Sequence, residues 1–126
     1  PIMSCADFIT IEVKGKGGHG STPHLCNNPI TTSSEIINKM NQIISQQSDS
    51  KYRSSLSIGV FKSGKELEEN IIPDCSLIKG SLRTFDENNR SNIKESIDYA
   101  CEYIGKLNHC NCNVNYADTS PVTYNH

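Results

Sequence analysis

The stretch FITIEVKGKGGHGSTPH, residues 8–24, contains a strand pattern that ends in a glycine-rich loop. The apolar residues of its first half alternate with polar ones, which is typical of a strand with one buried face. These apolar residues are Ile9, Ile11 and Val13. Just beyond the loop, Asn28 and Pro29 indicate the start of a helix, with Asn as the N-cap and Pro at the first helical position.

The rest of the chain contains one more helix pattern and three more strand patterns. Apolar residues recur at helical spacing in residues 30–44 and 93–107, and Asp86 is a suitable N-cap for the second helix. In the three strands the apolar residues alternate with polar ones or with glycine: Leu56, Ile58 and Val60; Ile78, Gly80 and Leu82; and Cys110, Cys112, Val114 and Tyr116. The order β-α-β-β-α-β predicts an α+β fold of the ferredoxin-like type, a four-stranded antiparallel sheet with both helices on one face.

Such a fold leaves the second face of the sheet uncovered. Because Ile78 and Leu82 are expected beneath the helices, period-two alternation places Arg83 on the open face. There it is available for a ligand or a neighbouring domain, although a surface ion pair with Asp86 or Glu87 would also account for it.

Composition indicates a single domain over residues 1–126, with a formal net charge of −2. No basic patch or paired strand aromatics are visible, so no nucleic-acid partner is expected. No run approaches the roughly 18 apolar residues of a membrane span, so no membrane partner is expected either. The six cysteines are interpreted as reduced, which favours a cytoplasmic location, and four of them as small core residues. These four are Cys75, Cys101, Cys110 and Cys112.

The glycine-rich loop could in principle bind a phosphate or a metal ion. Gly15, Gly17 and Gly20 match the dinucleotide fingerprint G-x-G-x-x-G, but no helix begins at the loop to receive the phosphate. His19 and His24 lack the further ligands that a zinc site needs.

The remaining interpretation is that the loop presents an imidazole. Gly17, Gly18 and Gly20 allow close backbone approach, and Pro23 stiffens the far end of the loop. His19 is therefore predicted to donate a hydrogen bond or transfer a proton near neutral pH, with His24 supporting the loop.

Four motifs in this order resemble one enzyme family: GKGGHGSTPH, NNPI, ENIIPD and GSLRTFDENNR. They are similar to the lid or dimerisation domain of the dizinc aminoacylase and carboxypeptidase G-like amidohydrolases, which include hippurate hydrolases and auxin-amino-acid-conjugate hydrolases. The resemblance covers essentially the whole chain, and both ends look cut from a longer protein. It implies that this domain binds no cofactor and is inactive alone, and that two zinc ions lie in a catalytic domain of the same parent chain.

The resemblance also implies roles for individual residues. His19 is expected to reach the active site of the partner subunit in a homodimer and to hydrogen-bond the oxyanion of an N-acyl-amino-acid substrate. Asn70 and Arg83 are together expected to hold the substrate carboxylate. The loop GKELEEN, residues 64–70, is longer and more acidic than is typical of the family, which could displace Asn70.

The dimer is expected to form through an edge strand, Ser54–Phe61, with the first helix beside it, giving a continuous eight-stranded sheet. The alternative is a free-standing ferredoxin-like module that binds a small molecule.

Overall fold

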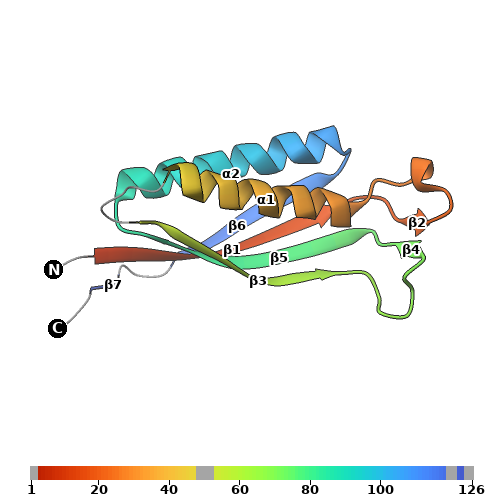
Figure 1. Cartoon of the computed structure of the whole chain (residues 1–126), viewed down its shortest axis with the longest axis horizontal. Helices are drawn as coiled ribbons and strands as arrows, with labels where there is room; N and C mark the ends of the chain where they lie inside the picture. The colour runs from red at the N-terminus through yellow and green to blue at the C-terminus, as the bar shows by residue number, and fades with distance from the viewer. Residues whose placement is uncertain (1–2, 48–52, 119–121, 124–126) are drawn as a thin grey trace.

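The computed structural model describes residues 3–47, 53–118 and 122–123. In chain order the elements are β1 (Met3–Lys14), β2 (Gly18–His19), the 3-10 helix η1 (Pro23–Leu25), α1 (Pro29–Gln47), β3 (Ser55–Ser63), β4 (Ile71–Ile72), β5 (Cys75–Thr84), α2 (Glu87–Leu107), β6 (Asn111–Asp118) and β7 (Val122–Thr123). Both long helices lie on one face of the sheet (Figure 1).

The main sheet has the strand order β3-β5-β1-β6, and every pair in it is antiparallel. This arrangement confirms the predicted ferredoxin-like α+β fold. Two short additions extend it. β7 pairs with the first residues of β1, and β2 pairs with β4 in a separate two-stranded ribbon beyond the opposite end of the sheet (Figure 1).

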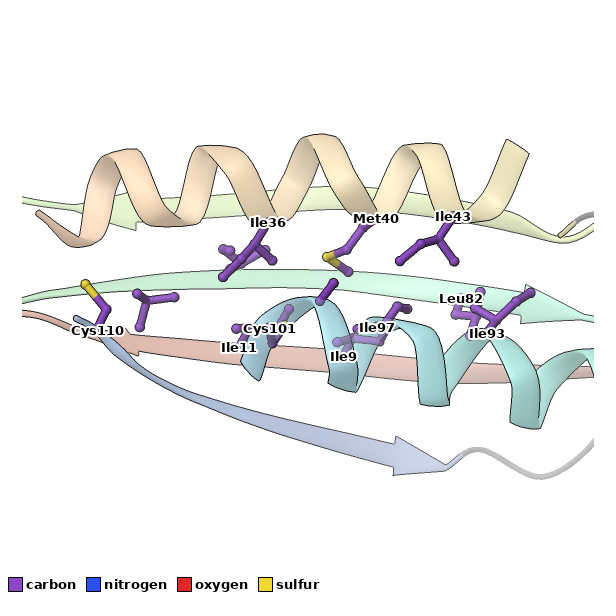
Figure 2. Packing of buried hydrophobic residues seen from close by; sticks show 13 residues of the cluster. Ile9, Ile11, Ile36, Met40, Ile43, Leu82, Ile93, Ile97, Cys101 and Cys110 are labelled. Carbon is purple, nitrogen blue, oxygen red and sulfur yellow. The ribbon is translucent and has the colours of Figure 1, made fainter. Parts of the chain in front are cut away.

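The hydrophobic core lies between the sheet and the two helices (Figure 2). Its largest side chains come from β1, β5, α1 and α2: Ile9, Ile11, Val13, Ile78, Leu82, Ile36, Met40, Ile93 and Ile97. Burying a side chain of this size stabilises the fold by about 1.5–3 kcal/mol relative to leaving it exposed. The buried side chains of β1 and β5 are those expected from the alternation, and Arg83 is exposed beside the buried Leu82, as predicted.

Both helices begin where the sequence predicts. The side-chain oxygen of Asn28 accepts a hydrogen bond from the main-chain N–H of Ile30 at 2.9 Å. Asp86 likewise accepts from the N–H of Asn88 at 3.1 Å. Each cap satisfies a donor that the first helical turn leaves without an intrahelical partner.

β3 contains an irregularity that the sequence did not indicate, and one expectation about side-chain placement is wrong. The register between β3 and β5 shifts between Ile58 and Val60, so Ile58 lies opposite Gly80 whereas Val60 lies opposite Lys79. The predicted alternation of half-buried and exposed residues holds through Val60, and this bulge places Val60 opposite a residue of the open face. Cys75, predicted as a core residue, is exposed at the start of β5, whereas Cys101 and Cys110 are buried as expected.

A candidate functional site at the glycine-rich loop

The β2–β4 ribbon brings His19 and Asn70 together. Gly18 lies opposite Ile72, and His19 lies opposite Ile71. Immediately beyond this pair, the main-chain N–H of Gly20 donates to the carbonyl oxygen of Asn70 at 2.8 Å. The two predicted site residues are thus held on adjacent chain segments, and both are exposed.

Two of the three glycines predicted to support the loop, Gly17 and Gly20, have main-chain atoms where a side chain would begin, whereas Gly18 faces a side chain that can move. A Cβ at Gly17 would overlap the carbonyl oxygen of Ile72, and one at Gly20 would lie 3.0 Å from the carbonyl oxygen of Asn70. A Cβ at Gly18 would lie 2.9 Å from the sulfur of Cys26. None of the three has a positive φ; among the described glycines only Gly64 does. Close approach, and not a left-handed conformation, is therefore what these glycines permit.

Asp74 fixes the base of the ribbon. Its Oδ1 accepts a hydrogen bond from the main-chain N–H of Gly17 at 2.9 Å, and its carbonyl oxygen accepts from the N–H of Gly15 at 2.8 Å. Sequence reasoning did not single out Asp74. Its only signal was its place in the ENIIPD motif, four residues after Asn70.

The His19 ring is exposed and folds back on its own loop through one nitrogen. Its Nδ1 accepts a hydrogen bond from the main-chain N–H of Ser21 at 3.1 Å and lies 2.7 Å from the Ser21 hydroxyl oxygen. The N–H of Thr22 donates to the His19 carbonyl oxygen at 3.0 Å, which closes the turn. Ser21 is a second residue that sequence reasoning missed, although a serine two residues after a histidine is well placed for such a local contact.

His24 lies in η1, directly after Pro23, which occupies the first turn of that short helix. Its side chain is exposed. In the part of the chain that the structure describes, no hydrogen bond joins it to the loop that carries His19. Its supporting role stays a prediction.

Asn70 keeps its link to the ribbon despite the long loop before it. The loop folds through two local hydrogen bonds, from the N–H of Glu68 to the carbonyl oxygen of Lys65 at 3.0 Å and from the N–H of Ile71 to that of Glu68 at 3.1 Å. A hollow of about 570 Å³ lies between this loop and the ribbon. Neither His19 nor Asn70 lines it, so it is not a pocket that these two residues share.

Arg83 lies at the far end of the sheet from the ribbon. It is opposite Ala6 of β1 and Ser55 of β3, close to the end of β5. At about 3.3 Å per residue, β5 carries the chain roughly 26 Å from Cys75 to Arg83. The expectation that Asn70 and Arg83 together hold one carboxylate therefore cannot be met within a single chain.

A metal ion has no donor set in this part of the protein. Within the described residues, no group of three or more His, Cys, Asp or Glu side chains could hold one. No helix among residues 3–47, 53–118 and 122–123 is long and apolar enough to cross a membrane.

Residues 6–108 match the family model described as the peptidase dimerisation domain of the M20 type. This chain belongs to that family. The peptidase dimerisation domain is 36% identical over 124 residues to a hippurate hydrolase of Campylobacter jejuni, covering 98% of this chain and 32% of that protein. It is 37% identical over 126 residues to thermostable carboxypeptidase 2 of Saccharolobus solfataricus, covering 99% of this chain and 32% of that protein.

The fold agrees with these matches. A solved protein of methicillin-resistant Staphylococcus aureus aligns with a TM-score of 0.87 and 26% identity, covering 97% of this chain and 31% of that one. The dimerisation domain thus spans about a third of the length of each of these relatives. The first two, a hippurate hydrolase and a carboxypeptidase, are hydrolases by name. The family predicted from the four motifs is confirmed.

Proposed function

We propose that this chain is the dimerisation and substrate-binding domain of a metal-dependent amidohydrolase that cleaves N-acyl-amino acids or related amides. One observation carries the proposal: His19 and Asn70 are exposed and held together at the β2–β4 ribbon, and neither of them lines the hollow beside it. Such a ribbon is suited to complete a site on another surface. The identity to a hippurate hydrolase supports an acyl-amino-acid substrate.

His19 would enter the active site of the partner subunit and donate a hydrogen bond to the oxyanion that forms when the amide carbonyl is attacked. Removing one such donor typically lowers kcat by about 10²–10³-fold. The glycine-rich backbone would allow the loop to lie close to the partner's surface, as it lies close to β4 here.

The substrate carboxylate would be held by residues of two different copies. Because Asn70 and Arg83 lie at opposite ends of β5, they can meet only if Asn70 comes from one subunit and Arg83 from the other. Arg83 is beside the start of β1 and near β7, where we expect the catalytic domain of the same parent chain to be joined. An arginine there offers its planar, two-pronged donor geometry to a carboxylate.

The metal chemistry would belong to that catalytic domain. Two divalent ions, with zinc expected, would polarise the scissile carbonyl and activate water there. The residues of this chain would bind and orient the substrate, so the 126-residue chain alone is expected to be inactive.

The test is complementation between variants of the parent protein. His19→Ala or Arg83→Ala homodimers would each carry the defect in both active sites. In a mixed dimer of the two, one site receives His19 from the Arg83→Ala copy and keeps its own Arg83, so hydrolysis of N-acyl amino acids should return on co-expression.

A matched control distinguishes this arrangement from simple subunit mixing. Because His19 and Asn70 share a ribbon and would serve the same site, a mixed dimer of His19→Ala and Asn70→Ala should stay inactive. Complementation in both pairs, or in neither, would be incompatible with the proposed arrangement. Full activity of His19→Ala would remove His19 from the reaction altogether.

A further inference from the structure

Two contacts from Ser21 to the His19 ring indicate which ring nitrogen carries the proton. The main-chain N–H of Ser21 is 3.1 Å from Nδ1 of His19, in hydrogen-bond geometry. A main-chain N–H can only donate, so Nδ1 must present its lone pair to it. In the neutral ring the single proton is then on Nε2.

The Ser21 hydroxyl acts in the same direction. Its oxygen lies 2.7 Å from the same Nδ1. Because Nδ1 accepts from the main-chain N–H, it carries no proton in the neutral ring. The Ser21 hydroxyl must therefore be the donor in its own contact with Nδ1. Both contacts involve Nδ1, and among the residues that the structure describes no hydrogen bond from this loop reaches Nε2.

The turn that makes these contacts is closed locally. Gly20, which separates His19 from Ser21, is fixed by its N–H bond to the Asn70 carbonyl oxygen. On the other side, Thr22 donates to the His19 carbonyl oxygen from both its N–H, at 3.0 Å, and its hydroxyl, at 3.2 Å. Ser21 is therefore held beside Nδ1 of the ring by bonds at both neighbouring residues.

We propose that Ser21 is a positioning residue that holds His19 in the Nε2–H tautomer and leaves that N–H as the outward donor. This inference rests on the proposed function for its catalytic meaning. A neutral ring in this tautomer can donate from Nε2 to an oxyanion but cannot accept a proton there. The tautomer therefore favours the role of oxyanion donor over that of general base at Nε2, two roles that the sequence left open for His19.

The tautomer can be measured directly on the 126-residue chain. Ring ¹⁵N chemical shifts of histidine-labelled protein, assigned with a His19→Gln variant, report which nitrogen is protonated at a pH where the ring is neutral. The expected result is a protonated Nε2 and an unprotonated Nδ1. A protonated Nδ1 would overturn the inference, whatever the activity of the parent protein.

The kinetic consequence is measured in the full parent protein. Ser21→Ala removes the hydroxyl contact but keeps the main-chain one, so kcat should fall about tenfold, the order expected for one hydrogen bond, with little change in KM. Ser21→Thr should restore most of kcat. Ser34→Ala, which removes an exposed hydroxyl bonded to the Ile30 carbonyl oxygen of α1, is the matched control and should change neither constant.

Failure of the inference and failure of the proposed function give different results. If Nε2 is protonated but His19→Ala keeps full activity, the tautomer is correct and the oxyanion role is wrong. If His19→Ala is inactive but Ser21→Ala matches wild type in kcat and in ring ¹⁵N shifts, the positioning role of Ser21 is wrong.

Discussion

Asp7 and Arg90 form a two-pronged ion pair at the edge of the core. The Asp7 carboxylate is fully buried and accepts from Nη2 of Arg90 at 2.8 Å and from Nε at 2.9 Å. Nζ of Lys94 also lies 2.9 Å from the same carboxylate. These contacts join β1 to the first half of α2 across 83 residues of sequence.

Asp7→Asn should destabilise the chain strongly. The substitution takes a fully buried charge away from two cations that are themselves mostly buried, although Arg90 keeps its contact with Glu87 at 3.1 Å. About 3–5 kcal/mol of unfolding free energy is typical for breaking a buried pair. Urea unfolding followed by circular dichroism measures this. Glu102→Gln is a useful comparison because it removes an exposed ion pair with Lys106, and it should barely move the unfolding midpoint. Equal effects of the two substitutions would contradict the assigned role of Asp7.

The cysteines should differ sharply in reactivity. Burial raises the pKa of Cys101 from 9.0 to about 12 and that of Cys112 from 9.0 to about 11. Since the thiolate is the reactive form, both should stay unlabelled by a thiol reagent at pH 8, whereas the exposed Cys75 should react at once. Mass spectrometry of peptides after timed labelling identifies the modified positions.

The same shifts predict how stability changes at high pH. The folded state keeps the Cys101 and Cys112 protons above pH 9, where an unfolded chain would release them. The unfolded state then binds fewer protons, so the free energy of unfolding should fall as pH rises from about 9 toward 12. Replacing Cys112 with Ala should reduce this slope, and an unchanged slope would show that the thiol is not responsible.

Features set by neighbouring residues could be predicted from the sequence. The caps at Asn28 and Asp86 depend on side chains two residues from the N–H groups that they satisfy, and the exposure of Arg83 follows from its alternation with Leu82. The bulge at Gly59 could not be predicted, because a register shift is visible only once β3 is paired with β5.

The candidate site was predicted in its residues but not in its arrangement. The pairing of His19 with Ile71 joins segments far apart in the sequence, and nothing local in either segment indicates the other. The joint role of Asn70 and Arg83 came from resemblance alone and stays a prediction. The length of β5 separates the two residues within one chain, a point that the resemblance does not address.

The free edge of β3 is the expected dimer contact. β3 is an outer strand of the main sheet, with β5 as its neighbour on the other side. Successive N–H groups along a strand point to opposite sides, so one of Ser57 and Ile58 directs its N–H outward. Of Ser57→Pro and Ile58→Pro, the variant that retains its circular dichroism spectrum should sediment as a monomer. A folded proline variant that stays dimeric would place the interface elsewhere.

Gly17 and Gly18 offer the sharpest test of the ribbon. A methyl group at Gly17 would overlap the carbonyl oxygen of Ile72, which is main chain and cannot rotate away. At Gly18 it would meet the sulfur of Cys26, a side chain that can move. Gly17→Ala should therefore weaken the β2–β4 pairing at a cost of about 1–3 kcal/mol, whereas Gly18→Ala should be tolerated.

Hydrogen exchange of the Gly20 N–H, which is bonded to the Asn70 carbonyl oxygen, measures the opening directly. In the parent protein, the kcat of Gly17→Ala should fall toward that of His19→Ala, because the same loop presents the imidazole. If exchange accelerates without loss of kcat, the ribbon does not need to be closed for the reaction.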